Sequence, residues 1–388
     1  MSNIKELLNG VDVVWKSLGD VAEVGTGRSN RQDEEENGKF PFYVRSKNIL
    51  RTNNYQFDET AIIIPGEGGI GDIFHYVEGK YALHQRAYRI HITYIQLDTK
   101  FLYYYMCGSF KNYILSKSVG ATSESIRKPM LEKFQIPIPP LHVQSEIVRI
   151  LDNFTELTAE LTAELTARKK QYSYYRDKLL TFADGEVEFK TLGEVGELVR
   201  GNGLPKTDFT ETGVPAIHYG QIYTYYGTST IETKSFVSPE TAKKLKKVNK
   251  GDVVITNTSE NLEDVGKALV YLGELEAVTG GHATIFKPNN KILGKYFTYY
   301  TQTTMFFSQK VKYAKGTKVI DVSATDLGKF KIPIPPLKEQ ERIVSILDKF
   351  DTLTNSISEG LPREIELRQK QYEYYRDLLL TFPKKAEI

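Results

Sequence analysis

Two glycine-rich segments are the first places where phosphate or cofactor chemistry would be sought. Residues 23–30 read EVGTGRSN, and residues 66–72 read GEGGIGD. A Walker-type phosphate loop ends in Lys followed by Ser or Thr, because the lysine reaches the phosphates and the hydroxyl binds magnesium. Residues 66–72 lack that ending, and charged residues follow 23–30 where a cofactor-binding helix would have to pack. Both segments are therefore interpreted as turns.

None of the catalytic or metal-binding patterns in the sequence assembles into a site. Glu188 and Lys190 resemble the end of a nuclease carboxylate–lysine motif, but the other copy has Val14-Trp15-Lys16 without an acid, so a charge pair in a strand or loop is favoured. The chain lacks the tetrapeptide Asn/Asp-Pro-Pro-Tyr/Phe, which orients a target amine for methyl transfer. Its six histidines show no metal-ligand spacing. We predict no catalytic residue and no metal site in this chain.

Basic residues around small polar loops point to phosphate contacts. In residues 110–133, and again in residues 308–331, a basic helix end runs into a short polar loop. Cationic side chains and hydroxyl groups are the protein groups that contact DNA phosphates. For any single lysine, a solvated helix face is the simpler explanation. The candidate phosphate-contacting residues are Lys117, Thr122, Ser123, Arg127, Lys128, Lys315 and Lys318.

Side chains that can read base edges occur in two separate stretches of the chain. Arg and Lys pair with guanine, and Asn and Gln pair with adenine. The residue types differ between the stretches, as expected if two similar modules read different sequences, although ordinary surface variation explains any one residue. The candidate base-reading residues are Arg45, Lys47, Asn48 and Arg86 in the first stretch, and His218, Tyr219, Gln221, Asn257 and His282 in the second.

The elements that would position these residues are arranged in a tandem repeat. The sequence FQIPIPPL at 134–141 returns as FKIPIPPL at 330–337, an offset of 196 residues. QYSYYRDKLLTF at 171–182 returns as QYEYYRDLLLTF at 371–382, an offset of 200 residues. Such dense identity identifies a duplication, in which each copy has a divergent region followed by a nearly constant one.

The constant regions are predicted to be long helices. From Ile147 onward, apolar residues recur at spacings of three and four, which is a helical stripe. Two TAEL units at 158–165 continue the stripe, and no Pro or Gly follows until after Phe182, so we predict one helix of about 40 residues and about 60 Å. Gly360-Leu361-Pro362 predicts a kink or break in the second copy. The spacer-helix residues are Leu157, Leu161 and Leu165.

The divergent regions are predicted to be α+β globules. Short β-rich runs bounded by Gly, Asn, Asp and Pro occur in both of them. Near the end of each region, residues 100–118 and residues 295–313 have the pattern of one amphipathic helix. The fold class is therefore α+β, with two globules that are each followed by a constant helix.

The two QYxYYRD segments offer a protein-binding surface. Tyr and Arg are favoured anchors in protein–protein contacts. Helical spacing places Tyr172 and Tyr175 toward a helix partner. Tyr174 and Arg176 then lie on another face, which points outward. Helix–helix packing alone is the simpler explanation. The candidate interface residues are Tyr174, Arg176, Tyr374 and Arg376.

Composition excludes several protein classes. The chain has 388 residues, with 51 Lys and Arg against 49 Asp and Glu, so its net charge of +2 gives no uniformly basic coat. Its single cysteine, Cys107, excludes an internal disulfide and a cysteine-based zinc site. No apolar run reaches the roughly 18 residues of a membrane span, and no signal-peptide core is found. We expect a cytoplasmic protein without a membrane partner.

These motifs together resemble the specificity (S) subunit of prokaryotic type I restriction-modification systems. The most specific are IPIPPLxxQxxIVxxLD at 136–152 and 332–348, QYxYYRDxLLTF, and the TAEL units. The resemblance implies two target recognition domains, separated by two long antiparallel helices in a pseudo-twofold duplication. It also implies an asymmetric, bipartite double-stranded DNA site. Two adenine-methyltransferase (M) subunits would carry AdoMet, and restriction-motor (R) subunits would use ATP and Mg²⁺.

The implied organisation sets the following boundaries. Domain 1, the first recognition domain, covers residues 1–140, and the first spacer helix covers 141–184. Domain 2 covers residues 185–336, followed by a second helical region at 337–382 and a tail at 383–388. SEGLPRE at 358–364 stands where the first copy has TAEL units, so only the first copy is a clean spacer.

Two other functions stay open on the sequence alone. A stand-alone DNA methyltransferase would bind AdoMet itself, and the missing tetrapeptide argues against it. A helical scaffold for other proteins would give no DNA footprint, even with M subunits present. A specificity subunit, by contrast, would have neither catalysis nor a cofactor of its own.

Overall fold

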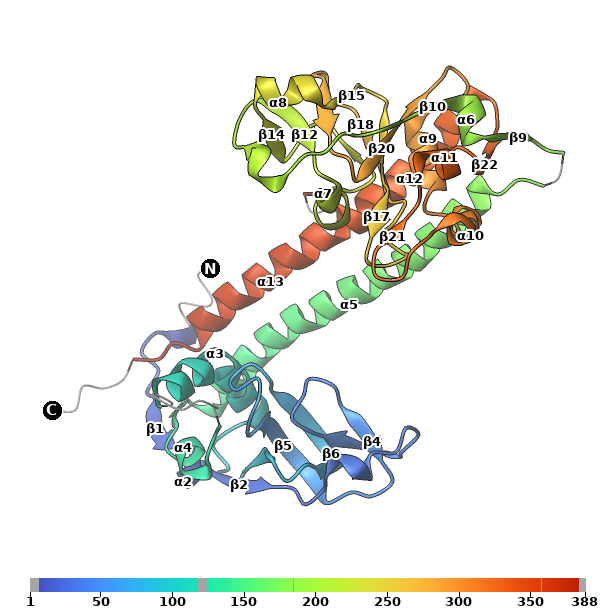
Figure 1. Cartoon of the computed structure of the whole chain (residues 1–388). Coiled ribbons are helices and arrows are strands. Elements are labelled where there is room, and N and C mark those ends of the chain that lie inside the picture. Colours follow the sequence, from blue (N-terminus) through green and yellow to red (C-terminus); the bar gives the residue numbers. More distant parts are fainter. Residues whose placement is uncertain (1–6, 118–124, 184, 357, 384–388) are drawn as a thin grey trace. The chain divides into compact units, whose positions relative to one another are not determined.

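The computed structural model describes residues 7–117, 125–183, 185–356 and 358–383. The chain divides into two compact units: Met1–Glu160 with Glu366–Ile388 form unit 1, and Leu161–Ile365 form unit 2. Both divisions fall within helices of the constant regions (Figure 1). Each unit therefore combines one divergent domain with the adjoining lengths of constant helix.

Domain 1 contains a six-stranded sheet, a two-stranded sheet and short helices. Its strands are β1 (Val14–Ser17), β2 (Ala22–Thr26), β3 (Phe40–Tyr43), β4 (Leu50–Thr52), β5 (Phe57–Pro65), β6 (His75–Leu83), β7 (Ala87–Ile92) and β8 (Gln135–Ile138). Its helices are α2 (Leu18–Val21), η1 (Arg31–Asp33), α3 (Thr99–Lys117) and α4 (Lys128–Glu132). The large sheet has the order β2-β7-β5-β6-β3-β4, in which only β3 and β6 run parallel. β1 and β8 pair separately and join the two ends of the domain.

Alternation along the strands lets the large sheet of domain 1 bury both faces. In β5, Ile62 and Ile64 belong to the core that α3 covers with Phe101 and Phe110. Ile63 belongs instead to a second cluster, which contains Tyr81. A strand covered on both sides reads as a continuous apolar run, which explains AIIIP at the end of β5. The loops after β3, β5 and β6 emerge from the ends of these packed strands.

Domain 2 is built from more and shorter elements. Its strands are β9 (Glu188–Thr191), β10 (Gly196–Arg200), β11 (Phe209–Thr210), β12 (Val214–Ile217), β13 (Ser229–Thr230), β14 (Ser235–Val237), β15 (Lys246–Val248), β16 (Val253–Thr256), β17 (Thr258–Ser259), β18 (Ala268–Tyr271), β19 (Ala277–Thr279), β20 (Ala283–Pro288), β21 (Ile320–Asp321) and β22 (Lys331–Ile334). Its helices are α6 (Leu192–Val195), η2 (Lys206–Asp208), α7 (Tyr219–Thr224), α8 (Pro239–Lys244), α9 (Gly294–Tyr300), α10 (Thr304–Tyr313) and α11 (Ala324–Leu327).

The sheet topology of domain 2 repeats that of domain 1, but one long strand is divided in two and the strands β11, β13 and β15 are added. The long strand β6 is replaced by two strands, β18 and β19, which lie in two five-stranded sheets ordered β10-β20-β16-β18-β13 and β11-β14-β12-β19-β15. β12 runs parallel to β19, as β3 runs parallel to β6. β9 pairs with β22, as β1 pairs with β8. The duplication predicted from the sequence therefore extends into the divergent regions.

The amphipathic helices expected near the end of each domain differ between the copies. The first is confirmed as the single helix α3. The second is divided into α9 and α10, so one continuous helix over 295–313 was a wrong prediction. The cause is local: the Thr303 hydroxyl accepts a hydrogen bond from the Phe306 backbone N at 3.2 Å and caps a new helix start.

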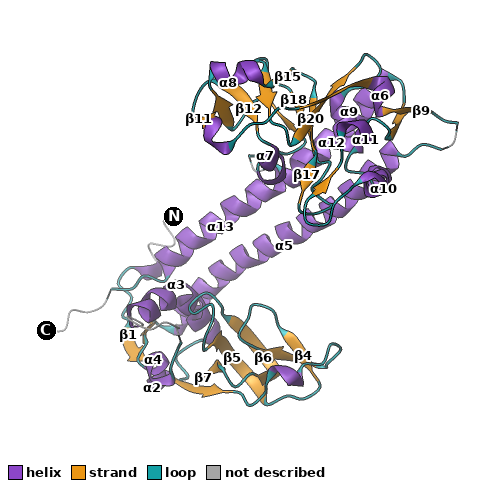
Figure 2. Cartoon of the chain, in the orientation of Figure 1, coloured by secondary structure: helices purple, strands orange, loops and turns teal. Residues whose placement is uncertain are grey.

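The constant regions form the helices that their apolar stripes predict (Figure 2). The first region is the 40-residue helix α5 (Leu141–Leu180). The second is divided into α12 (Leu337–Asn355) and α13 (Gly360–Leu379), which confirms the predicted break. Gly360 has a φ of 76°, and a Cβ there would lie 2.3 Å from the Thr352 carbonyl oxygen, so only glycine fits. The spacer-helix residues Leu157, Leu161 and Leu165 are half-buried.

Aromatic pairs join the constant helices within each unit. In unit 1, the rings of Phe154 and Tyr375 stack with centroids 5.2 Å apart. In unit 2, the rings of Phe350 and Tyr175 stack at 5.8 Å. These pairs are images of each other under the repeat, because Phe350 corresponds to Phe154 and Tyr375 to Tyr175. Each pair therefore joins α5 to the helical region of the second copy within one unit.

Candidate nucleic-acid interface

Domain 1 is fixed to α5 by buried polar contacts, beginning with Gln144. This side chain is fully buried. Its Oε1 accepts a hydrogen bond from the Asp98 backbone N at 2.8 Å, and its Nε2 donates to the carbonyl oxygens of Gln96 at 2.8 Å and Pro139 at 2.7 Å. Three backbone groups are thereby satisfied inside the protein, where an unpaired group would be costly.

Asp152, two turns further along α5, makes the second contact with domain 1. Its carboxylate accepts hydrogen bonds from Lys100 Nζ at 2.8 Å and from the Tyr104 hydroxyl at 2.6 Å. Burial, together with the bond to Asp152, raises the pKa of Tyr104, which stays a protonated donor. We call these contacts of the buried Gln and the following Asp the helix joint.

Domain 2 has the same helix joint. Gln340 is also fully buried and repeats each hydrogen bond of Gln144, accepting at 2.9 Å and donating at 2.8 Å and 2.9 Å. Asp348 accepts from Lys295 Nζ at 2.9 Å and from the Tyr299 hydroxyl at 2.5 Å. These Gln and Asp residues are the Q and D of the repeated motif IPIPPLxxQxxIVxxLD. The helix joint therefore explains why both copies keep them. Sequence reasoning assigned these residues no role, although their identity in both copies was the available signal.

Three loops of domain 1 bring charged candidates together. Arg45 follows β3, Glu67 follows β5, and Arg86 lies between β6 and β7. Glu67 Oε1 lies 2.8 Å from Nη1 of Arg45 and 2.8 Å from Nη1 of Arg86. The hydrogen bond from Arg86 lowers the pKa of Glu67, so an ionised carboxylate holds both guanidinium groups. Glu67 was missed in the sequence because its glycine-rich surroundings read only as a turn.

A depression of about 430 Å³ lies beside these charged side chains, and Arg45, Glu67 and His84 are among its lining residues. His84 is nearly buried, and its Nδ1 accepts a hydrogen bond from the Arg86 backbone N at 3.0 Å. This contact fixes the turn that carries the Arg86 side chain. The other two base-reading candidates of domain 1, Lys47 and Asn48, are exposed in the loop after β3.

The corresponding loops of domain 2 bring aromatic candidates together. His218 and Tyr219 follow β12, and His282 lies between β19 and β20. The Tyr219 ring centroid lies 4.6 Å from that of His218 and 4.8 Å from that of His282. Thr258 Oγ1, just after β16, lies 2.9 Å from His282 Nδ1. Burial lowers the pKa of His218, which favours a neutral ring whose Nδ1 accepts from the Gly220 backbone N at 3.2 Å.

Two candidates of domain 2 are engaged in the internal structure. Asn257 is fully buried, and its Nδ2 donates to the Val322 carbonyl oxygen at 3.1 Å. Gln221 is half-buried, and its Nε2 donates to Ser235 Oγ at 2.5 Å. A base edge can reach Asn257 only if this part of domain 2 opens. We therefore remove Asn257 from the direct base contacts that we propose.

The phosphate-contacting candidates at described positions are all exposed. They are Lys117, Arg127, Lys128, Lys315 and Lys318. Lys315 Nζ lies 3.3 Å from a carboxylate oxygen of Asp326, yet its side chain stays 78% exposed and open to a phosphate. Thr122 and Ser123 lie outside the described residues.

The interface candidates divide into two kinds. Tyr174 and Tyr374 are 60% and 58% exposed, as expected for outward-facing residues. The side chains of Arg176 and Arg376 are only 15% and 20% exposed, which differs from the expected outward orientation. Helical geometry explains the difference, because Arg176 lies four residues after Tyr172 and packs over its ring at 5.8 Å.

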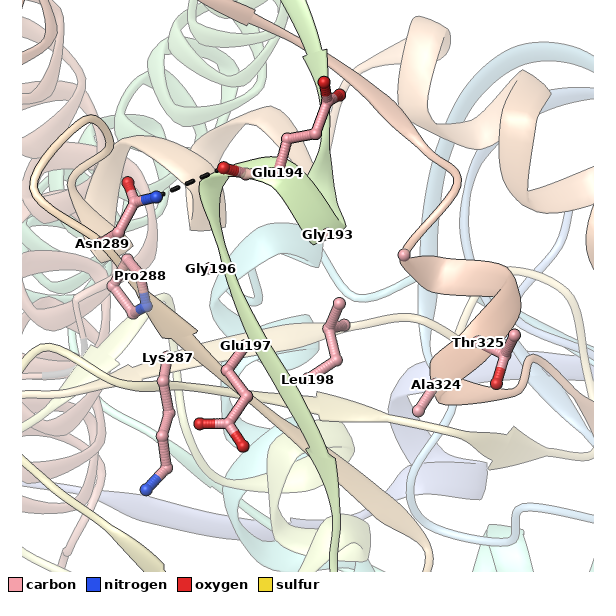
Figure 3. A pocket seen from close by; sticks show the side chains of 11 residues that line it. Gly193, Glu194, Gly196, Glu197, Leu198, Lys287, Pro288, Asn289, Ala324 and Thr325 are labelled. Carbon is pink, nitrogen blue, oxygen red and sulfur yellow. Dashed lines mark hydrogen bonds between the residues drawn. The ribbon is translucent and has the colours of Figure 1, made fainter.

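Figure 3 shows a depression in domain 2 whose lining includes Glu197 and Lys287. None of the candidate DNA-contacting residues lines it. A Cβ at Gly196 would lie 2.3 Å from the Phe286 ring and 2.5 Å from the Lys287 carbonyl oxygen, so bare backbone forms part of the wall. Close packing between β10 and β20 therefore requires glycine at this position.

Within residues 7–117, 125–183, 185–356 and 358–383, no cluster of three or more His, Cys, Asp or Glu is arranged to hold a metal ion. None of the described helices is both long and apolar enough to cross a membrane.

Comparisons with known proteins match this architecture. The family model for the "Type I restriction modification DNA specificity domain" matches residues 10–168 and 184–367. A specificity subunit of an Escherichia coli type I restriction enzyme is 36% identical over 415 residues, and the alignment covers 100% of this chain and 99% of that protein.

Two solved structures share the fold. The S subunit of a type I restriction-modification system from M. genitalium superimposes with a TM-score of 0.60 and 19% identity, covering 97% of this chain and 98% of that chain. A chain from a structure concerning complex assembly and conformational transition of the type I R-M system gives a TM-score of 0.60 and 16% identity, covering 96% and 98%.

The family matches cover both copies of the duplication, so neither a stand-alone methyltransferase nor a protein-only scaffold is favoured. They also agree with the predicted α+β class and with two divergent domains joined to long helices. The chain belongs to the specificity subunits of type I restriction-modification systems, and its role is non-catalytic recognition of a DNA sequence.

Proposed function

We propose that this chain reads a bipartite, asymmetric DNA site, with one half recognised by domain 1 and the other by domain 2. The observation that carries this proposal is an identical helix joint beneath different exposed loops. Because the helix joint is the same, each domain is attached to its constant helix through equivalent residues, and its loops emerge from equivalent strand ends. Because arginines and a carboxylate occupy the loops of one domain, and aromatic rings those of the other, the two half-sites differ.

Strand pairing at the two ends of each domain supports the proposed domain boundaries. Pairing of β1 with β8 brings the beginning and end of domain 1 together, and pairing of β9 with β22 does the same in domain 2. We take residues 1–140 and 185–336 as the two recognition domains. Residues 141–184 and 337–382 are the helical regions that bear them.

The family and the duplication support partners for this chain on its constant helices. Two M subunits bind the constant helices, one at each QYxYYRD segment, where Tyr174 and Tyr374 supply exposed aromatic anchors. AdoMet is bound by the M subunits, and ATP with Mg²⁺ by the R subunits. This chain directs the adenine methylation and restriction carried out by these subunits to the site, in the cytoplasm. A net charge of +2 favours weak binding by the free chain and tighter binding once M subunits surround the duplex.

The test is methylome sequencing of a host that expresses this chain with its methyltransferase partner. The expected result is one methylated motif made of two different half-sites separated by unspecified base pairs. A continuous motif, or a perfect palindrome, would overturn the proposed division between two independent readers. AdoMet bound to the purified chain alone would instead support a methyltransferase.

A further inference from the structure

The loops after β3, β5 and β6 meet in domain 1, and strand register identifies their counterparts in domain 2. Tyr43, the last residue of β3, pairs in parallel with β6 at Leu83. Ile217, the last residue of β12, pairs in parallel with β19 at Thr279. Three residues lie between Leu83 and Ala87, the first residue of β7, and three lie between Thr279 and Ala283, the first residue of β20. Tyr43 and Ile217 are therefore equivalent positions.

This equivalence extends by two residues into the loops. Arg45 lies two residues after Tyr43, and Tyr219 lies two residues after Ile217. Arg45 and Tyr219 therefore leave equivalent strand ends in equivalent places. Their side chains differ completely, since one is a guanidinium group and the other a phenol.

A backbone hydrogen bond fixes the second equivalence. Gly66, just after β5, donates its backbone N–H to the Arg86 carbonyl oxygen at 2.9 Å. Asn257, just after β16, donates its backbone N–H to the His282 carbonyl oxygen at 2.9 Å. Arg86 and His282 therefore occupy the same position of the two domains.

The third equivalence follows one residue later. Glu67 comes directly after Gly66 and forms an antiparallel bridge with Ser125. Thr258 comes directly after Asn257 and forms the same type of bridge with Asp321. Glu67 and Thr258 thus match in sequence order and in backbone pairing.

We call the two sets of equivalent residues the loop triads. The loop triad of domain 1 is Arg45, Glu67 and Arg86, and the loop triad of domain 2 is Tyr219, Thr258 and His282. In both triads the side chains contact one another, through the carboxylate in domain 1 and through the imidazole in domain 2. The fold thus gathers the same three positions twice and fills them with different chemistry.

The loop triad of domain 1 has the chemistry of a guanine reader. Arg45 and Arg86 have side chains that are 43% and 60% exposed. Glu67 engages Nη1 of each guanidinium group, and the edge formed by Nη2 and Nε has the donor spacing for guanine O6 and N7. The shared carboxylate restricts the rotation of both long side chains, so they lose less conformational entropy when DNA binds.

The loop triad of domain 2 offers different groups. It contains no Arg or Lys, and so lacks the bidentate donor that favours guanine. It presents hydroxyl groups, an imidazole and two ring faces instead. Its contacts between Tyr219, Thr258 and His282 hold these groups in one arrangement.

We propose that the loop triads are the main base-reading positions of the two domains, and that the loop triad of domain 1 recognises guanine in its half-site. The inference rests on the proposed division of the DNA site between the domains. It assigns Glu67 and Thr258 as positioning residues, which act through the neighbouring side chains.

The test measures competition among DNA duplexes for the full chain assembled with its M subunits. Each base pair of the methylome-defined site is replaced in turn. With Arg86→Ala, preference for guanine should fall about 10- to 100-fold at one position of one half-site. The other half-site should keep its full discrimination. His282→Ala should have the reverse pattern, with loss confined to the second half-site.

Matched variants separate base reading from general attraction to DNA. Lys117→Ala removes an exposed phosphate-contacting candidate of domain 1 that lies outside the triad, and should weaken all duplexes equally. Glu67→Gln leaves both arginines in place and should lower guanine preference less than Arg86→Ala. The triple change Tyr219→Arg, Thr258→Glu and His282→Arg should introduce a guanine preference into the second half-site.

The outcomes distinguish this inference from the proposed function. Exchange of residues 1–140 for those of another specificity subunit identifies the half-site read by domain 1. If the site is bipartite but this half-site contains no guanine, the inference is overturned and the proposed function is not. Equal weakening of all duplexes by Arg86→Ala would also overturn it, because that is the behaviour of a phosphate contact. A continuous site would overturn the proposed function and this inference together.

Discussion

The two recognition domains are nearly identical where they contact the constant helices and least alike at the loop triads. At the helix joint, Gln144 and Gln340 make the same three hydrogen bonds. At the loops, Glu67 between two arginines stands where the other domain has Thr258 beside an imidazole. Buried polar groups resist change because a lost partner leaves an unsatisfied group, whereas exposed side chains change with little cost to the fold.

The largest effect on stability is expected when the helix joint is broken. Gln144→Leu should leave the Asp98 backbone N–H and two carbonyl oxygens without partners, and so lower the free energy of unfolding by about 3 kcal/mol. Gln340→Leu should cost a similar amount in domain 2. Chemical denaturation measures the change in the free energy of unfolding for each variant. Hydrogen exchange of the affected amides shows which domain opens.

An exposed pair on the same helix gives the control for this experiment. Glu146 pairs with Arg149 on the surface of α5, so Glu146→Gln should change stability by less than about 0.5 kcal/mol. If one glutamine variant were neutral while the other was destabilising, the two joints would not be energetically equivalent. The comparison between the domains would then hold for geometry only.

A smaller effect is expected where the cores differ. Ile114 in domain 1 is buried, and the corresponding residue of domain 2 at the offset of 196 is Lys310, which is 5% exposed. Burial lowers the pKa of Lys310 to about 8, although Glu263 and Asp264 oppose the shift. Lys310→Ile should therefore stabilise domain 2 at pH 7 by about 2 kcal/mol, since a buried ammonium group is removed.

The pH dependence gives this prediction its sign. The native state binds the Lys310 proton less tightly than the unfolded state, so this group destabilises the fold below pH 8, and stability recovers as the pH rises from about 8 toward 10.5. The difference between Lys310→Ile and the natural chain should shrink over that range in thermal melts. A difference that stayed constant with pH would mean that packing, and not charge, separates the two cores.

The smallest effect on stability is expected from lengthening the first helical region, which has TAEL units where the second has a break. One additional TAEL unit after Leu161 adds about 6 Å and a net rotation of about 40°, so the apolar stripe almost keeps its face. A base pair contributes about 3.4 Å and roughly 36°. The methylated motif should gain one unspecified base pair between unchanged half-sites.

A single alanine inserted at the same point provides the contrast. It rotates everything beyond it by about 100°, turns Leu165 and Tyr172 away from their partners, and should impair stability or assembly. A TAEL insertion that left the motif length unchanged, or altered a half-site, would show that α5 does not set the spacing. Both variants are compared by melting temperature and by methylome sequencing.

The helices and the duplication were predictable because their signals are local or repeated. The stripe from Ile147 specifies α5, and Gly360 specifies the break, since both depend on residues a few positions apart. The division of residues 295–313 into two helices was missed because Thr303 is an ordinary residue until its hydroxyl caps a helix. Arg176 was predicted to face outward because only apolar residues were assigned to the packed face of the helix. Its guanidinium group instead packs on the Tyr172 ring.

The sequence by itself determined the α+β class, the repeated architecture and the family, because these are written in motifs and periodicities. The loop triads were decided only by tertiary structure. Arg45, Glu67 and Arg86 are separated by 22 and 19 residues along the chain, and no local pattern links them. They meet because parallel pairing of β3 with β6, and antiparallel pairing of β5 with β7, bring three strand ends to one place. Strand register is set by the packing of the whole sheet, so its consequences appear only once the chain has folded.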